Sequence, residues 1–453
     1  MKKHLFLFLT IHTAVYTFQV KAQPTVKPPQ SWMIQSGPMV GYSDYREVLL
    51  WVQTKTPATV KFTFWEQGQP NQRRNTAEVR TQAAKANTAQ ALASDLTPGK
   101  RYEYEVVING KKVARPYPLQ FQTQTLWQWR TDPPAVRFAV GSCTYINESA
   151  YDRPGKPYGS NYQIFNMIAS QKPDFMLWTG DNTYTREVDW NSRSGLLHRY
   201  THTRALPEMQ ALLGGTHHYA TWDDHDYGPD NADRSYSLKR DALDVFKAFW
   251  GNPNYVFENE GVTGTFQWAD CQFFLMDDRW WRSPNELRQG PREFLGKKQL
   301  DWLLDALSNS QASFKFVVIG NQVVNPTAMP ETYATYAEER AELFRRITED
   351  NVPGVLFLSG DRHHSILWKQ ERPGTYPLYD LTISPLTSGT AKLYPAEEPQ
   401  VQFPETYVPE HNFGLLEVTG PLKDRMLKIT CIDASGNAKW SREIRSTDLR
   451  TGK

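Results

Sequence analysis

The sequence predicts an α/β fold with helices packed against sheet faces, preceded by a small all-β domain. Residues from about 30 to 128 contain short strands separated by polar turns, a spacing typical of a β-sandwich. From Pro134 onward, apolar strands alternate with amphipathic helices, which is the pattern of an α/β domain. Hydrophobic residues make up 40% of the 453 residues, so a core is available to both parts.

Residues 1–22 have the layout of a secretory signal peptide. Lys2 and Lys3 precede an apolar run over residues 5–18, and small or apolar residues precede a cleavage site after Ala22. The run is too short for a membrane-spanning helix, although a retained N-terminal anchor is the alternative. There is no twin arginine, which favours a Sec-type route. We therefore expect an exported protein, periplasmic or secreted, without a transmembrane anchor.

The all-β domain is expected over residues 30–128. Its predicted strands cover residues 47–54, 59–65, 77–81 and 101–109. The segment that begins Leu96-Thr97-Pro98 and reaches Tyr102 resembles the corner motif of fibronectin-type and immunoglobulin-like domains, in which a tyrosine hydrogen-bonds back across the turn. No titratable cluster occurs in this part, so it is expected to be structural or to dock a partner.

The α/β domain is expected over residues 134–445. Its predicted strands are 136–140, 175–179, 314–319 and 355–358, and its predicted helices are 161–170, 243–250, 298–307 and 337–348. Two further segments, 263–277 and 413–432, have the pattern of antiparallel hairpins at the periphery of the domain. Residues 186–203 and 384–409 are expected to form loops.

Polar residues follow four of the apolar strands, at the point where each strand ends. These strand ends are Gly141-Ser142-Cys143, Gly180-Asp181 with Tyr184 three residues later, Asp223-Asp224-His225-Asp226, and Gly360-Asp361-Arg362-His363. In open α/β sheets, ligands bind at the carboxyl ends of the strands. Three carboxylates around His225 repel one another unless a cation compensates them. Cysteine, aspartate, tyrosine and histidine side chains together therefore predict a metal site.

These motifs resemble those of the alkaline phosphatase D (PhoD-like) family within the calcineurin-like metallophosphoesterases. The resemblance covers residues from about 30 to 440 and includes the stretch 300–322, which ends Ile319-Gly320-Asn321-Gln322. It implies a metallophosphoesterase-like sheet sandwich flanked by helices, after an all-β domain. It also implies phosphate-ester hydrolysis with Fe³⁺ and Ca²⁺ as metals, other divalent metals being the alternative.

The resemblance assigns roles to individual residues. The family's metal ligands match Cys143, Asp181, Tyr184, Asp224, Asp361 and His363. Asp181 is expected to bridge two metals, and Asp223 is the alternative to Asp224. His225 falls on the histidine that contacts the scissile phosphate.

The expected reaction is attack of a metal-bound hydroxide on the phosphorus of a phosphomonoester or phosphodiester. We expect His225, oriented by Asp226, to stabilise or protonate the departing alkoxide. Arg279 and Arg362 are candidate substrate-binding residues because a guanidinium can donate paired hydrogen bonds to phosphate oxygens. Surface salt bridges are the alternative for both arginines.

Several other residues allow two interpretations. Cys271 and Cys431 match no ligand of the family, so they are either buried thiols or a disulfide pair. The histidines of the pair His217-His218 either extend into the metal site or lie outside it. The rings of Trp280-Trp281 either form the base of a substrate pocket or pack in the core.

Composition limits the function classes. The chain has 51 Lys+Arg and 49 Asp+Glu, a net charge of +2, which argues against specific binding to nucleic acid. A small phosphate ester is therefore the expected partner, while the oligomeric state stays open. One alternative is an inactive or weakly active binding protein that docks a polymer through its β-sandwich. Another is a metalloenzyme that acts on a sulfate ester or a nucleic acid.

Overall fold

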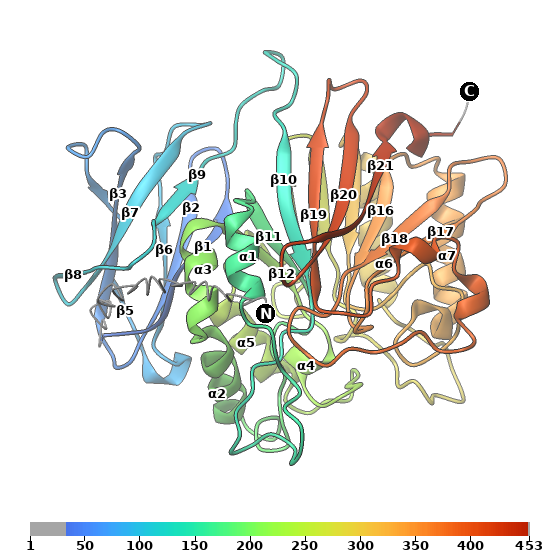
Figure 1. Ribbon diagram of the computed structural model, residues 1–453, viewed down its shortest axis with the longest axis horizontal. Coiled ribbons are helices and arrows are strands. Elements are labelled where there is room, and N and C mark those ends of the chain that lie inside the picture. The colour runs from blue at the N-terminus through green and yellow to red at the C-terminus, as the bar shows by residue number, and fades with distance from the viewer. Residues whose placement is uncertain (1–32, 452–453) are drawn as a thin grey trace, which may run out of the picture. The chain divides into compact units, whose positions relative to one another are not determined.

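The computed structural model describes residues 33–451, so the predicted signal peptide over residues 1–22 lies outside the described residues. These residues form three β-sheets with helices around them (Figure 1). The strands are β1 (Ile34–Ser43), β2 (Val48–Thr54), β3 (Thr59–Glu66), β4 (Arg74–Asn75), β5 (Val79–Arg80), β6 (Thr88–Ala93), β7 (Arg101–Ile108), β8 (Lys111–Val113), β9 (Gln120–Gln122), β10 (Val136–Gly141), β11 (Phe175–Thr179), β12 (His217–Thr221), β13 (Gly264–Trp268), β14 (Cys271–Leu275), β15 (Phe314–Val318), β16 (Val355–Ser359), β17 (Ile366–Gln370), β18 (Leu378–Thr382), β19 (Asn412–Thr419), β20 (Met426–Asp433) and β21 (Ala438–Arg445). The helices are α1 (Ile164–Ser170), α2 (Arg193–Arg204), α3 (Gln210–Gly215), α4 (Asp224–Tyr227), α5 (Lys239–Phe249), α6 (Lys297–Asn309) and α7 (Ala337–Glu349).

The largest sheet has nine strands in the order β21-β20-β19-β10-β11-β12-β1-β2-β6. Strands β10, β11 and β12 pair in parallel at its centre, and β19 to β21 extend it antiparallel. Almost every residue of the central strands is buried, which explains their continuous apolar sequences. The hairpin predicted over residues 413–432 is confirmed as β19 and β20.

A second sheet has six strands in the order β13-β14-β15-β16-β18-β17. The hairpin predicted over residues 263–277 is confirmed as β13 and β14. However, β14 also pairs in parallel with β15, so this hairpin is a continuous part of the sheet. Strands β15 and β16 pair in parallel, and β16 ends at the turn that carries Asp361 and His363.

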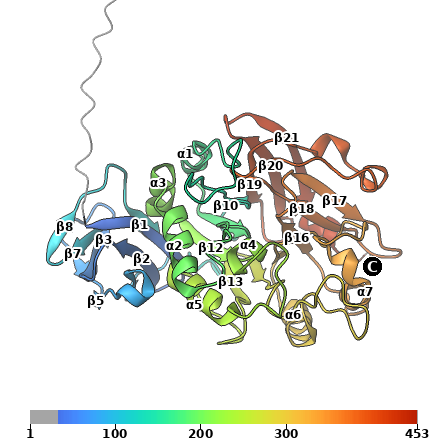
Figure 2. The same cartoon turned by 90° about the horizontal axis from the view of Figure 1, so that it is seen from below.

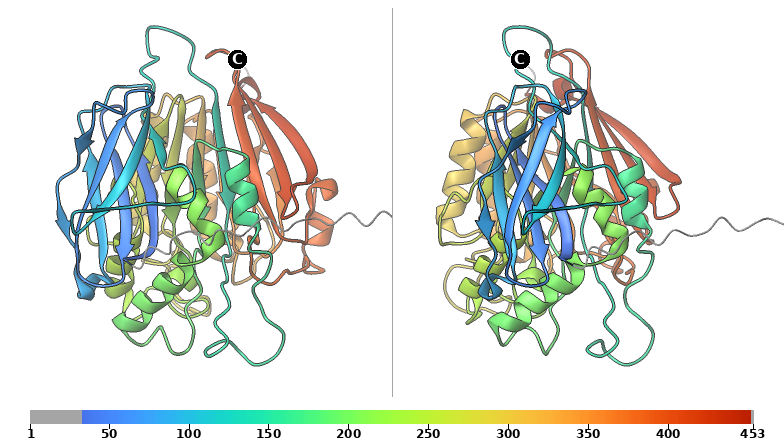
Figure 3. Two further views of the ribbon diagram at one scale, coloured as in Figure 1. Left: turned by 60° about the vertical axis from the view of Figure 1, so that its left-hand side comes forward. Right: turned by 90° about the vertical axis from the view of Figure 1, so that its left-hand side faces the viewer.

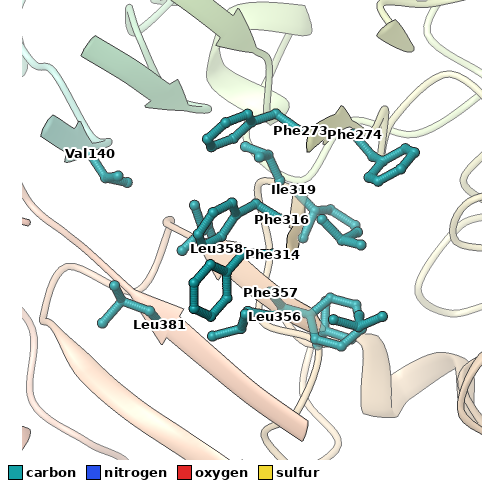
Figure 4. Close-up of a cluster of buried hydrophobic side chains, with 14 of the residues drawn as sticks. Val140, Phe273, Phe274, Phe314, Phe316, Ile319, Leu356, Phe357, Leu358 and Leu381 are labelled. Atoms are coloured by element: carbon teal, nitrogen blue, oxygen red, sulfur yellow. The ribbon is translucent and has the colours of Figure 1, made fainter. Parts of the chain in front are cut away.

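Apolar side chains fill the space between these two sheets (Figure 4). The ring of Phe138 in the nine-stranded sheet stacks on Phe175 with centroids 4.9 Å apart. It also meets Phe273 and Phe316 of the six-stranded sheet edge-on, at 5.3 and 5.5 Å. Such edge-to-face pairs stabilise a core beyond the effect of their buried area. The two sheets therefore form the predicted sandwich.

Helices cover the outer faces of the sandwich (Figure 2). Helices α1, α2, α3 and α5 pack on the nine-stranded sheet, where Trp178 contacts Phe165 of α1. Helix α7 covers the other sheet through Phe344, which lies against Phe357. Helix α2 lies inside the stretch 186–203 that was expected to be a loop. Its sequence is mostly polar, so it shows no apolar stripe of helical period. The local signal for the helix is Ser192, whose side chain caps its N-terminus.

The N-terminal strands form a β-sandwich of their own (Figure 3). One layer is the sheet β4-β3-β7-β8, with β5 and β9 paired at its sides. The other layer is β1, β2 and β6, which continue the nine-stranded sheet because β1 pairs with β12, placing Val40 opposite His217. The predicted corner is confirmed, since the Tyr102 hydroxyl accepts a hydrogen bond from the Thr97 amide at 2.9 Å.

The three cysteines, all within the described residues, are free and buried. Cys271 lies in β14 and Cys431 in β20, so these two thiols belong to different sheets. The free, buried thiols agree with the buried-thiol interpretation. Within residues 33–451, we find no helix with the length and apolar character that crossing a membrane requires.

Candidate active site

The turns that follow β10, β11, β12 and β16 bring the predicted ligands together. Two groups of potential ligand atoms form there, each with its members within 4.8 Å of one another. The first group contains Cys143, Asp181 and His363, and the second contains Asp181, Asp224 and His225. Asp181 therefore belongs to both groups, which is the arrangement that a carboxylate needs in order to bridge two cations.

Short polar contacts connect the first group. The Tyr184 hydroxyl lies 2.9 Å from Oδ2 of Asp181 and 3.0 Å from Nε2 of His363. The Cys143 sulfur lies 3.7 Å from the same Asp181 oxygen and accepts a hydrogen bond from the Ser384 hydroxyl at 3.0 Å. Sulfur, phenol oxygen, carboxylate oxygen and imidazole nitrogen thus face one point.

The second group forms at the start of α4. The His225 amide donates to Oδ1 of Asp224 at 2.8 Å and to Oδ1 of Asp181 at 3.3 Å. Asp223 precedes the helix as its N-cap, and its carboxylate is engaged by Arg279 and Asn321. Of the two alternatives in the sequence, Asp224 is therefore the residue that belongs to the group.

Asp361 lies close by and is also buried. Its Oδ2 atom has no hydrogen-bond partner among the described residues, and the same is true of Oδ1 of Asp278. A buried carboxylate oxygen without a partner is costly, so such an atom calls for a missing partner. A cation would supply one.

The backbone at four predicted ligands adopts the left-handed conformation. The φ angles are 60° at Cys143, 51° at Asp181, 66° at Asp361 and 56° at His363. Residues other than glycine rarely adopt such angles, and they cluster at functional sites. The turns that carry these ligands are also closely packed. At Gly360 there is no room for a side chain, since an added Cβ atom would collide with the Ser142 hydroxyl.

Electrostatics at the site favour neutral forms of several ligands, whereas His225 and Arg279 outweigh burial at Asp224 and lower the pKa of that carboxyl. Burial raises the pKa of the Cys143 thiol to about 12, and the Asp361 carboxylate adds to this effect. Burial, followed by the carboxylate of Asp224, raises the pKa of Asp181 well above its usual range. Burial, with His225 nearby, lowers the pKa of His363 to about 3, which leaves a neutral imidazole. A positive ion would reverse the effect on the acids and would accept the neutral imidazole as a ligand, so these residues fit a metal.

The structure places the carboxylate of Asp226 against backbone amides. Both oxygens of its carboxylate accept from the Asn182 amide at 3.1 Å, and Oδ2 also accepts from the Asp223 amide at 3.1 Å. Asp226 therefore fixes the turns after β11 and β12 and does not orient the imidazole of His225. Nε2 of His225 lies 3.6 Å from Oδ1 of Asp230.

The structure places the two arginines predicted to bind substrate in ion pairs within the protein. Arg279 is completely buried and donates to Asp223 and Asn321. Arg362 is buried and donates to Glu397 at 3.0 Å. Both guanidinium groups form ion pairs, but these are buried pairs that hold the walls of the site.

The histidine pair His217-His218 and the tryptophan pair Trp280-Trp281 have structural roles. His217 bonds to the backbone of Gly41 and Gln122, and His218 bonds to Trp178 and Leu212, so neither histidine reaches the site. Trp280 is buried in the core between the nine-stranded sheet and its helices, and Trp281 packs against that core.

Sequence patterns did not reveal three residues near the ligands. The Tyr158 hydroxyl lies 3.0 Å from Nδ1 of His363, and Asp278 accepts from the Asn321 amide. Glu331 contacts Arg362 at 3.3 Å. Asp278 could have been identified, because it follows strand β14 and ligands bind at the carboxyl ends of strands. Tyr158 and Glu331 lie in loops, where the sequence gives no local signal.

A cavity of about 320 Å³ opens beside the ligands. Tyr184 and His225 form its inner wall, where their rings stack 4.1 Å apart. Tyr145, Tyr158 and Trp190 also line it. The cavity gives a bound molecule access to the imidazole of His225.

Known proteins share this fold. The solved structure of PhoD aligns with a TM-score of 0.73 at 17% identity, covering 92% of each chain. The purple acid phosphatase PPD1 from yellow lupin (Lupinus luteus) seeds aligns with a TM-score of 0.65 at 10% identity, covering 91% of this chain and 76% of the other. Both likenesses concern the fold.

Sequence comparisons extend the likeness to the family. Alkaline phosphatase D of Bacillus subtilis (strain 168) is 23% identical over 433 residues, covering 80% of this chain and 69% of that protein. Residues 32–126 match a family described as a domain of unknown function (DUF7800), and residues 138–419 match the family described as PhoD-like phosphatase. The chain therefore belongs to the PhoD-like phosphatase family and is a phosphoesterase hydrolase.

Proposed function

We propose that the protein is an exported, metal-dependent hydrolase of phosphate esters that acts on monoesters, diesters or both. The observation that supports this most directly is that Asp181 belongs to both ligand groups. The reaction adds water across the bond between phosphorus and the leaving oxygen, which yields an alcohol and a phosphate product.

We assign Fe³⁺ to the first group and Ca²⁺ to the second. Once deprotonated, Cys143 and Tyr184 are strongly donating ligands, which suit a trivalent ion. Asp224 supplies carboxylate oxygen, which suits calcium, and Asp361 can serve either ion. When bound, the two cations supply charge neutralisation for the phosphate and a more acidic water.

His225 is the residue that would contact the leaving oxygen. Its Nδ1 atom is buried, whereas its side chain is 21% exposed and Nε2 faces the cavity near Asp230. Nε2 is therefore the atom that can donate a proton to a departing alkoxide. The stacked ring of Tyr184 keeps the imidazole in this orientation.

Export and domain division belong to the same proposal. The apolar run after Lys2 and Lys3 supports a Sec-type signal peptide over residues 1–22 and a periplasmic or secreted protein. The Tyr102 corner supports a fibronectin-like sandwich over residues 30–128, before a catalytic domain over residues 134–445.

The test combines metal analysis with assays on nitrophenyl phosphate and bis(nitrophenyl) phosphate. We expect bound iron and calcium in the purified protein and hydrolysis of at least one ester. Asp181→Asn should lower the rate at least a thousandfold, whereas Asp305→Asn, on the exposed face of α6, should not. Unchanged activity in Asp181→Asn would refute the site. A metal-loaded protein that hydrolyses neither ester would favour the binding-protein alternative.

A further inference from the structure

Aromatic rings and charged side chains together line the cavity beside His225. Its volume of about 320 Å³ lies at the lower end of the range for small-molecule sites, roughly 300–1,000 Å³, and suits a single ring. Tyr145, Tyr158 and Trp190 also line it, and the Tyr158 hydroxyl reaches His363 of the first ligand group. It therefore continues the active site outward from His225.

Two of these rings are held in place by polar contacts. The Tyr145 hydroxyl donates to Asp152 at 2.8 Å, and the guanidinium of Arg186 lies 3.9 Å from the Tyr145 ring centroid. The Tyr158 hydroxyl contacts His363, and its ring meets that of Tyr145 edge-on at 4.9 Å. Because these rings are fixed before a ligand arrives, binding would cost little ordering of the wall.

Trp190 differs from the two tyrosines. It is partly buried, yet within residues 33–451 it joins none of the hydrophobic clusters, and no aromatic ring pairs with it. Its backbone oxygen accepts from the Tyr236 hydroxyl, which fixes the chain at this point. An indole that lines a cavity without a packing partner offers a surface for contact with a ligand.

Charge does not provide the selectivity of the cavity. Arg186 pairs with Asp152 at 2.8 Å, and Arg153 pairs with Glu187 at 3.3 Å. The remaining charged groups at the lining, Lys156 and Asp230, have opposite signs. The lining is thus close to neutral, which leaves ring contact as the main source of recognition.

We propose that this cavity binds a ring in the alcohol part of the substrate, with the ring face against Trp190 and one edge toward the pair formed by Tyr145 and Tyr158. This inference rests on the proposed function, because His225 belongs to the second ligand group, lines the cavity and would face the leaving oxygen. A leaving alcohol would extend from His225 into the cavity. Aromatic rings and sugar rings each present an apolar face that can lie against an indole.

The kinetic test compares benzyl phosphate, glucose 6-phosphate and methyl phosphate. Benzyl and methyl alkoxides are similar leaving groups, so a difference in rate reports contact with the ring. We expect kcat/KM to be about tenfold higher for at least one ring-bearing ester than for methyl phosphate. Trp190→Ala should abolish this difference, and Trp190→Phe should keep most of it. Trp129→Ala, which alters a fully exposed indole, is the control and should not change it.

The two ring-bearing substrates also identify the source of the ring. A preference for benzyl phosphate indicates an aromatic alcohol, and one for glucose 6-phosphate indicates a sugar. Equal kcat/KM for all three esters in the native protein overturns the inference while leaving phosphate-ester hydrolysis intact.

A binding measurement separates this inference from the proposed function. Calorimetry should show benzylphosphonate, which cannot be hydrolysed, binding the native protein about tenfold more tightly than methylphosphonate does, with the difference lost in Trp190→Ala. If benzylphosphonate binds more tightly in this way but no ester is hydrolysed, the ring-binding role of the cavity is supported and the proposed function is refuted. If the two phosphonates bind equally and Trp190→Ala changes neither, the ring site is wrong even in an active enzyme.

Discussion

The Nε atom of Arg279 donates a hydrogen bond of 2.6 Å to Oδ1 of Asp223, and neither side chain is exposed. Asn321 donates to the other oxygen of Asp223 at 3.0 Å. This pair stands directly behind the ligand groups and neutralises one carboxylate of a crowded acidic site. Removing one member would leave an unpaired charge in the interior.

Arg279→Met should therefore lower the free energy of unfolding by about 3–5 kcal/mol, measured by urea denaturation. The matched control is Arg345→Met on α7, whose ion pairs with Glu342 and Glu349 are exposed. This control should change stability little. Equal losses in the two variants would contradict the role assigned to the buried pair.

Cys143→Ser should reduce the iron content of the protein at least tenfold, measured by elemental analysis. The native, iron-loaded protein should absorb visible light through charge transfer from the thiolate and phenolate, and the variant should lose most of this absorbance. Cys431→Ala, which alters another buried thiol, is the control. A colourless native protein with full activity on zinc alone would exclude iron.

Tyr158→Phe should weaken metal binding about 10- to 100-fold, because Nδ1 of His363 loses the hydroxyl that lies 3.0 Å away. The phenyl ring remains in the cavity wall, so the KM for ring-bearing esters should change little. Metal titration of chelator-treated protein measures the first effect, and steady-state kinetics the second. Tyr151→Phe, at an exposed tyrosine of the same loop, should alter neither quantity.

His217 should make stability depend on pH. Its Nδ1 donates to the Gly41 oxygen and its Nε2 accepts from the Gln122 amide, and burial lowers its pKa from 6.5 to about 4. Between these values the unfolded chain binds a proton that the folded protein does not, so the free energy of unfolding decreases as pH falls. The loss contributed by His217 reaches about 3 kcal/mol near pH 4 and is absent above pH 6.5.

His217→Gln keeps a donor and an acceptor but removes the titration. Denaturation at a series of pH values should show a smaller decrease in stability from pH 7 to pH 4 for the variant than for the native protein. The comparison at pH 8, where the imidazole is neutral in both states, measures the cost of the substitution itself. Identical slopes would contradict the assignment.

The sequence by itself predicted the α/β sandwich and the candidate ligands. Asp181 and Asp361 could be identified because each directly follows a buried strand and a glycine, and parallel strands bring their carboxyl ends to one edge. The corner at Tyr102 could also be predicted from a short stretch of sequence, since its hydrogen-bond partner Thr97 lies five residues away. Signals of this kind depend on neighbours along the chain.

Only the tertiary structure decided where the polar side chains point. Asp226 follows His225 in the sequence, yet its carboxylate turns to the amide of Asn182, 44 residues earlier. Tyr158 meets His363 across 205 residues, from a loop without any repeating pattern. The joining of β1 to β12 is similarly long-range. A partner far along the chain leaves no trace in local sequence, because contact between the two depends on how the intervening sheets and helices pack.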